Sequence, residues 1–364
     1  MTPDDTSDDK PDHTPSNKAL LVLPRLRVQN ANAISSPLTW GFPAITAFTG
    51  LMTALERRLG REAGVAFYGV GVICHGFEPQ VTTGGFTRSF CLTRNPVLQD
   101  GSTAAIVEEG RVHLDITLVF DVELTDALFG DAERAELARR VGELVAGLRI
   151  AGGSVVLPAA ALAGADHPMR RPPRPSLVLM PDDPEERRRS FRRLSRRWLP
   201  GFALVSRDDL LHAHLGRLRE QQQNAQATLL DAWLDLSRLN HRAVVPAAET
   251  TTGAADAPAG SAAASPASSP PPQRVEWRTD RRVGWTVPIP VGYAALSELH
   301  PPGAVAGARD PSVPFRFVES VYSIGQWVSP HRLTDVRELL WEPQYDAATG
   351  LYRCTNAFKP SSSV

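Results

Sequence analysis

The stretch VHLDITLVF at residues 112–120 decides the fold class of this 364-residue chain. Apolar side chains occupy every even-numbered position of the stretch, and His113, Asp115 and Thr117 stand between them. Successive side chains of a β-strand point to opposite faces, so this alternation is typical of a strand with one apolar and one polar face. We therefore expect a half-exposed strand here.

Three more strands and two helices are expected around this strand. Apolar runs at residues 20–28 (LLVLPRLRV) and 65–75 (VAFYGVGVICH) predict two strands, and residues 152–157 (GGSVVL) predict a glycine turn that leads into a fourth. Pro24 lacks an amide N–H, which predicts an edge strand or a bulge. Helical spacing predicts one helix that stops at Gly60 and one that follows residue 120, carried by Phe48, Leu51, Met52, Leu55, Leu59, Leu137, Val141, Leu144, Val145 and Leu148.

The resulting order, strand–helix–strand–strand–helix–strand, is that of the ferredoxin-like split βαβ unit and places residues 19–165 in the α+β class. Such a unit packs two helices on one face of a four-stranded antiparallel sheet and leaves the other face available. RNA-recognition modules use the same arrangement. Residues 76–110 lose the periodicity and predict a protruding loop or hairpin.

Two stretches are too poor in apolar side chains to build a core. Residues 1–18 predict a disordered acidic tail, and residues 243–273, made almost entirely of Ala, Pro, Ser, Thr and Gly, predict a low-complexity linker. They leave a basic helical region at 166–242 and a mixed C-terminal part at 274–364 that completes the fold. The tail contains five aspartates: Asp4, Asp5, Asp8, Asp9 and Asp12.

The motif content argues against several classes of protein. Three cysteines lie far apart, which favours buried or free thiols in a reducing compartment over a disulfide framework or a zinc site. No HExxH, GxSxG, phosphate-loop or dinucleotide motif occurs. The chain also has no secretory signal and no apolar run of about 18 residues. We expect a cytoplasmic protein without catalytic residues, metal, cofactor or membrane contact.

The formal charge of −1 hides a strongly basic segment. Residues 170–197 contain ten arginines against four acids, and the acids stand where a helix would begin. Phe191, Leu194 and Trp198 predict the buried stripe of that helix, with the arginines turned to solvent. Arginine favours bidentate contacts with phosphate, so the segment predicts polyanion binding, while a merely solvated basic helix stays open as the alternative.

A second polar concentration follows the first strand. The connection at residues 29–43 combines amides, hydroxyls and aromatics; the amides can read base edges, and Trp40 or Phe42 can stack on an unpaired base. Asparagines that only form turns, and a Trp40 buried between Pro37 and Pro43, are the alternative, and we expect Trp40 to matter more for folding than for binding.

Bare backbone amides at Gly152 and Gly153 can approach a phosphate closely. With the basic and amide-bearing segments, they complete the set of candidate RNA-binding residues: Arg25, Arg27, Gln29, Asn30, Asn32, Trp40, Arg88, Arg94, Arg149, Gly152, Gly153, Ser154, Arg188, Arg192, Arg193 and Arg196.

A catalytic alternative rests on two histidines. His75 and His113 fall on neighbouring expected strands and could serve as acid and base in RNA cleavage. Histidines on strands more often serve packing. A third possibility is a pure protein scaffold, in which the basic helix binds an acidic subunit surface.

Six segments resemble the family of second Csy proteins of type I-F CRISPR systems. They are residues 20–60 (LLVLPRLRVQNANAISSPLTWGFPAITAFTGLMTALERRLG), 92–114 (LTRNPVLQDGSTAAIVEEGRVHL), 148–156 (LRIAGGSVV), 192–207 (RRLSRRWLPGFALVSR), 283–297 (VGWTVPIPVGYAALS) and 317–333 (FVESVYSIGQWVSPHRL). The acidic tail and the linker are the main departures.

The resemblance implies a Cas-five-like RAMP protein with an RNA-recognition-like palm and a protruding thumb. Residues 76–110 would be the thumb, Gly152-Gly153 the glycine-rich loop, and residues 187–197 a phosphate contact. It also implies a protein that does not cut nucleic acid, holds the 5′ handle of the CRISPR RNA, pairs with the large first Csy subunit and abuts an adjacent backbone Csy subunit. Target DNA would then be recognised by guide pairing within the assembled complex.

Overall fold

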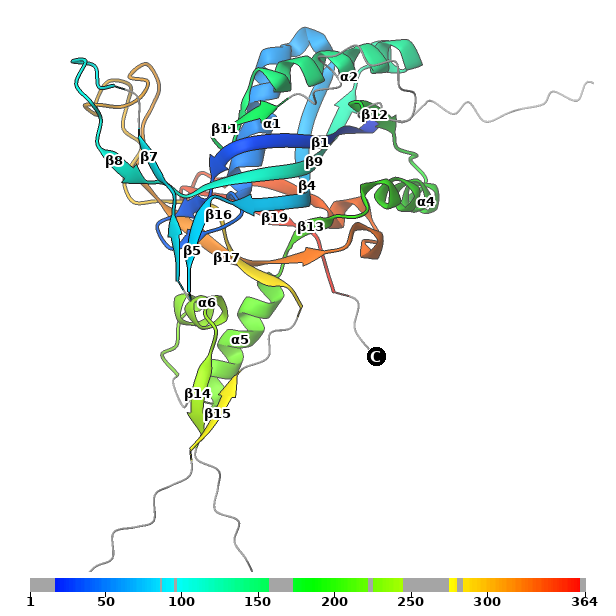
Figure 1. Cartoon of the computed structure of the whole chain (residues 1–364). Coiled ribbons are helices and arrows are strands. Elements are labelled where there is room, and N and C mark those ends of the chain that lie inside the picture. The colour runs from blue at the N-terminus through cyan, green and yellow to red at the C-terminus, as the bar shows by residue number, and fades with distance from the viewer. Residues whose placement is uncertain are drawn as a thin grey trace, which may run out of the picture.

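The structure, a computed structural model, describes residues 17–85, 87–94, 97–156, 173–221, 225–244, 275–279 and 284–360. Residues 1–16 of the expected tail and 245–273 of the expected linker lie outside these residues. The expected bounds are wrong at residue 18, which begins a strand at Lys18–Asn32, and at residues 243–244, which end one at His241–Val244. The described chain is a mixed α+β protein with five α-helices and a large antiparallel sheet of eleven strands (Figure 1).

Four strands form the first half of the sheet in the order β11-β1-β9-β4. They are β11 (Gly153–Val156), β1 (Lys18–Asn32), β9 (Arg111–Leu124) and β4 (Val65–Pro79), and the last three are longer than expected. Helix α1 (Ile45–Leu59) links β1 to β4, and α2 (Asp131–Ala146) lies between β9 and β11. Both helices pack on one face of the sheet, the inner face, where they bury the apolar stripes that the periodicity predicts.

The bulge expected at Pro24 is present, but the alternative of an edge strand is wrong. The β1–β9 register shifts between Leu23 and Leu26, so that Pro24 and Arg25 together face Thr117. On its other side β1 pairs with the short strands β12 (Ser176–Leu179) and β11, which leave the segment around Pro24 unpaired. The missing N–H of Pro24 therefore costs the sheet no hydrogen bond.

The second half of the sheet curls into a closed ring. Strands β13 (Phe202–Ser206), β17 (Val318–Val328), β16 (Thr286–Ala295), β19 (Leu351–Asn356) and β18 (Leu340–Asp346) follow β4 in this order, and β18 pairs again with β4. The buried Trp341 donates its indole N–H to Leu204 O across the ring, at 2.8 Å. Helix α1 packs against β4, β16 and β18 and so covers the inner side of the ring.

Helix α4 (Pro184–Ser195) and the 3₁₀ turn η4 (Arg196–Trp198) cover part of the other face, the outer face. Phe191 and Trp198 pack there with Leu20 on β1 and Val119 on β9. The expectation that this face stays free is therefore wrong for the half that lies near the start of β1. For the same reason the middle of β9 is not half-exposed: Thr117 and Val119 are 1% and 0% exposed.

The remaining elements project from this body (Figure 1). Residues 76–110 hold two hairpins, β5 (Val81–Gly84) with β6 (Thr87–Phe90) and β7 (Leu92–Arg94) with β8 (Ile106–Glu108). A separate projection combines α5 (Asp208–Gln221), α6 (Leu229–Ser237), β14 (His241–Val244) and β15 (Glu276–Thr279).

The smallest elements are β2 (Ile34–Ser36), β3 (Thr39–Trp40), β10 (Arg149–Ile150) and the 3₁₀ turns η1 (Arg61–Ala63), η2 (Asp126–Leu128), η5 (Pro330–Arg332) and η6 (Val336–Glu338). The three cysteines are free thiols, with Cys354 buried and Cys74 and Cys91 half-buried, as the spacing predicts.

Candidate nucleic-acid interface

The part of the outer face that α4 leaves open is polar. Cross-strand partners share a face of a sheet, and the register pairs Arg27 with Asp115, Gln29 with Ser154, and Ser154 with Arg149. Neighbouring strands thus bring together side chains from three distant parts of the sequence. We call this surface the polar sheet face; it consists of Arg25, Arg27, Gln29, His113, Asp115, Arg149 and Ser154.

Arg25 owes its position to the bulge in β1. Its backbone is left-handed, with φ 54°, and its N–H donates to the hydroxyl of Thr117 at 3.1 Å. The guanidinium forms an ion pair with Asp115 at 2.9 Å, which offsets its charge. Arg27 and Arg149 are exposed and form no ion pair with any acid in the described ranges. They are the uncompensated cations of the polar sheet face.

The two asparagines mainly shape the chain. Asn30 also has a positive φ, 55°, and its N–H donates to His113 Nδ1 at 3.1 Å. Asn32 uses its amide to accept from the N–H of Ile34 at 3.0 Å and to donate to the carbonyl of Ile34 at 2.8 Å. These contacts favour the turn-forming role of Asn32 over base reading.

The two glycines differ in what they do. Ala151 and Gly152, with φ 49° and 79°, form the two-residue turn between β10 and β11. A Cβ on Gly153 would lie 2.6 Å from Gln29 O and 2.7 Å from Ala31 N, so this glycine allows β11 to approach β1. Gly152 is exposed, with open space where a Cβ would stand. Only Gly152 presents its backbone to an incoming phosphate.

Trp40 is not buried, contrary to the expectation. Its side chain is 51% exposed and meets Phe90 edge-on at 5.8 Å between ring centroids. Its cross-strand partner in the hairpin β2–β3, Ile34, is also exposed, so this face of the hairpin lies in solvent. Phe42 instead packs between Phe48, at 5.7 Å, and Trp327, at 4.9 Å. An unpaired base can therefore stack on Trp40 but not on Phe42.

Helix α4 carries the predicted cations on its solvent side. Asp183 caps the helix by accepting the N–H of Glu186 at 2.7 Å, and Arg188 pairs with Glu185 at 2.7 Å. Five further arginines are exposed, and none forms an ion pair with an acid of the described chain. Their spacing places them on one side of the helix. We call them the arginine stripe: Arg189, Arg192, Arg193, Arg196 and Arg197.

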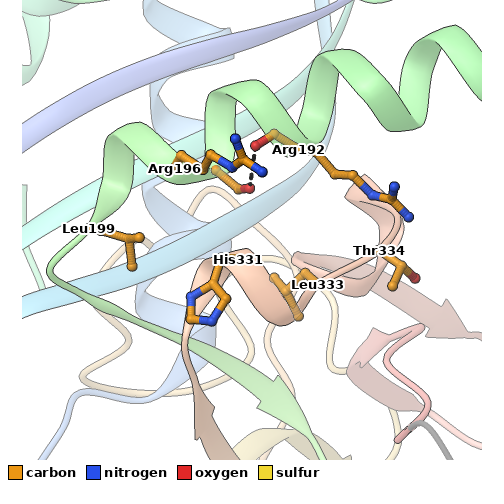
Figure 2. A pocket seen from close by; sticks show the side chains of 7 residues that line it. Arg192, Arg196, Leu199, His331, Leu333 and Thr334 are labelled. Carbon is orange, nitrogen blue, oxygen red and sulfur yellow. Dashed lines mark hydrogen bonds between the residues drawn. The ribbon is translucent and has the colours of Figure 1, made fainter.

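A groove of about 690 Å³ runs along this helix. Figure 2 shows Arg192 and Arg196 on one wall and His331, Leu333 and Thr334 on the other. Leu199 and Leu333 give the groove an apolar lining, and the His331 ring is held by Ser329 Oγ at 2.9 Å. Cations beside an apolar slot suit a ligand that combines phosphate with an aromatic ring.

The candidate residues thus form separate groups. Those of β1, β10 and β11 meet on or beside the polar sheet face. On the covered part of the same outer face, Arg192 of α4 and Arg196 of η4 line the groove, whereas Arg188 and Arg193 do not. Arg88 lies exposed on β6 and Arg94 on β7, and the side chain of Arg94 is not described. Sequence reasoning missed His331 and Thr334, because only the tertiary fold brings the 3₁₀ turn η5 and the residues that follow it beside α4.

The two histidines are not cross-strand partners. The register pairs His113 with Glu78, three residues beyond His75. His75 Nδ1 donates to Pro200 O at 2.7 Å, so Nε2 accepts from the Thr117 hydroxyl at 2.8 Å. Burial lowers the pKa of His75. In the described regions no cluster of His, Cys, Asp and Glu has the geometry of a metal site, and no helix there is long and apolar enough to span a membrane.

Comparison with known proteins supports the resemblance. Residues 21–354 match the family model of the CRISPR-associated protein Cas_Csy2. The CRISPR-associated protein Csy2 of Pseudomonas aeruginosa (strain UCBPP-PA14) is 46% identical over 338 residues, which are 92% of this chain and 94% of that protein. The chain therefore belongs to the Csy2 family of CRISPR-associated proteins.

Proposed function

We propose that the chain is a non-catalytic subunit of a type I-F Csy surveillance complex that binds the 5′ handle of the CRISPR RNA. It pairs with the large first Csy subunit, abuts the adjacent backbone subunit and supports guide-directed recognition of foreign DNA. One observation carries the proposal: in a Csy2-family chain, uncompensated arginines, an apolar groove and a polar sheet surface share the outer face of one sheet.

The architecture supports a palm and a thumb. The strand order β11-β1-β9-β4, with α1 and α2 on the inner face, is the order of a ferredoxin-like unit. The hairpins β5–β6 and β7–β8 project from β4 and β9 and would be the thumb. Handle nucleotides would then lie across the outer face, between the polar sheet face and α4.

Single-stranded RNA suits this surface better than an acidic protein surface. Stacking of bases needs an exposed aromatic ring, which Trp40 provides, and backbone binding needs cations without internal partners, which the arginine stripe provides. An acidic protein would need neither the exposed indole nor the mixed lining of the groove.

The hydrogen bonds of His75 support the proposal that the chain does not cleave RNA. A general base needs a free ring nitrogen within reach of the 2′-hydroxyl, and both nitrogens of His75 are engaged by Pro200 and Thr117. The lowered pKa also keeps this ring neutral, which disfavours a role as general acid. Ribonucleolytic processing of the repeat remains the alternative activity, to be judged by experiment.

Filter binding with handle RNA tests the proposal on the chain purified with its large partner. We expect affinity to fall by about 0.7 log units per log unit of salt for each phosphate neutralised, and the RNA to be recovered intact. Binding that ignores salt, or no binding, would contradict the proposal. A discrete RNA product that disappears in His75→Ala would establish the nuclease alternative.

Charge reversal separates RNA binding from a scaffold role. Arg192→Glu with Arg193→Glu should weaken RNA binding and leave the pairing of subunits intact. The matched control is Arg140→Glu, at an exposed position of α2 on the helix side of the sheet. Loss of subunit pairing with unchanged RNA affinity would instead favour the scaffold.

A further inference from the structure

We propose that the acidic segment at residues 1–16 docks on the arginine stripe of its own chain. Docking itself is independent of RNA binding; its consequence, competition with nucleic acid, rests on the proposed function. The occupant of the stripe in the free subunit is then a part of this chain that precedes the family match, which begins at residue 21.

An anionic partner would stabilise the stripe. Its five guanidiniums lie three and four residues apart, a spacing at which like charges destabilise a helix. Two of the acids at the start of α4 serve other contacts: Asp183 caps the helix and Glu185 pairs with Arg188. An anion along this side would relieve the repulsion among the five arginines.

The acidic segment leaves the fold beside this helix. Lys18 begins β1, and its carbonyl accepts the N–H of Met180 at 2.8 Å, four residues before α4 begins at Pro184. Leu20 packs in the same cluster as Phe191 of α4. Figure 1 shows the start of β1 next to β12, above α4.

The segment has the length to cover the stripe. Asp12 precedes Lys18 by six residues and Asp4 by fourteen, which correspond to extended lengths of about 20 and 46 Å. The stripe spans about 12 Å along the helix axis. Tethering also gives the segment an effective concentration of about 1 mM at the stripe. All five aspartates are therefore within reach.

The order of the charges is complementary. Because the segment leaves near the N-terminal end of α4, it meets the helix in antiparallel order, from Asp12 back to Asp4. In this order the gaps between aspartates are three, one, three and one residues, and the gaps between arginines from Arg189 to Arg197 are the same. Acids and guanidiniums thus both come in pairs, and guanidiniums bind carboxylates in bidentate geometry. An extended segment rises about twice as far per residue as a helix, so the match is one of order and pairing and not of distance.

Zero-length cross-linking tests the docking without any RNA. Arg193→Lys keeps the positive charge and adds a primary amine, and carbodiimide joins this amine to a nearby aspartate as an amide while it is itself hydrated to a urea. We expect mass spectrometry of the full chain to find residues 4–12 joined to position 193 at low salt, and the product to be lost at about 0.5 M salt.

The matched control is Arg217→Lys, at an exposed position of α5 in the separate projection. Equal coupling to both positions, or coupling to neither, would overturn the docking. Coupling between two molecules rather than within one, recognised by its dependence on protein concentration, would also overturn it.

A binding measurement tests the competition. Changing the five aspartates to asparagine should tighten the binding of a single-stranded handle oligonucleotide by roughly threefold to tenfold at low salt, and the difference should vanish at high salt. Equal affinities despite an observed cross-link would overturn the competition. If neither chain binds RNA, the proposed function fails, and the cross-link still decides the docking.

Discussion

Asp121 on β9 is a carboxylate whose charged form is destabilised by its surroundings. Burial, with the nearby Glu342, raises the pKa of Asp121 to about 6. The folded chain therefore holds a proton here that the unfolded chain releases near pH 4. Between about pH 4 and pH 6 the unfolded state binds fewer protons, so the contribution of this group to stability falls as the pH rises.

Asp121→Asn removes this cost, because a neutral amide replaces the buried charge. At pH 7.5 we expect the free energy of unfolding to rise by roughly 1–2 kcal/mol, and at pH 4 to change little. Urea denaturation at the two pH values measures both. The exposed Asp126→Asn is the control, and a variant that is less stable than the parent at pH 7.5 would refute the account of Asp121.

Gly153 is required for close contact between two backbones. Gly153→Ala places a Cβ within 2.8 Å of three backbone atoms of β1, which cannot move without breaking the sheet. We expect the free energy of unfolding, measured by thermal denaturation, to fall by roughly 1–3 kcal/mol. Gly50→Ala in α1 has open space and should stabilise the helix by about 0.5–1 kcal/mol. Equal effects at the two positions would contradict the packing role of Gly153.

At the scale of elements, local patterns were reliable where one element decides its own structure. The apolar spacing predicted α1, α2 and α4, and most of the residues that it names are buried, although Leu144 and Leu148 are only half-buried. Pro24 signalled the bulge. The covered outer face and the exposed Trp40 were missed, because α4 packs on β1 and β9 from far along the chain and no local pattern shows which surface a helix will cover.

The low-complexity stretch joins two paired strands. Antiparallel pairing of Val244 with Glu276 brings together the two ends of the chain that flank it. Deleting residues 247–270 should leave thermal stability unchanged or raise it by up to about 1 kcal/mol, because a shorter loop costs less entropy to close. A loss above about 2 kcal/mol would contradict this. A deletion extended through β15 is the control, since it removes the pairing strand and should destabilise.

At the scale of the molecule, the closed ring was beyond sequence reasoning. Its strands β13, β16, β17, β18 and β19 come from the basic and C-terminal parts of the chain, and the second pairing of β4 with β18 depends on tertiary contacts. The ring also positions η5, and with it His331, beside α4. The candidate site could therefore be predicted as a set of cations but not as a groove.

The distribution of charge over the whole molecule bears on whether the outer face binds RNA. Arg27 and Arg149 on the polar sheet face and the arginines of α4 form two basic groups on the outer face, although the chain as a whole carries a formal charge of −1. A short single strand of RNA can lie along these basic groups, whereas the net negative charge of the chain would repel it weakly. The proposed RNA binding therefore depends on the local placement of charge and not on the net charge.

Photo-crosslinking of handle RNA in the assembled complex, followed by mass spectrometry, tests the central claim most directly. We predict crosslinks from the 5′ handle to residues 25–32, 149–154 or 188–197 of this chain, on RNA that remains uncut. Crosslinks confined to the neighbouring subunits would contradict the account.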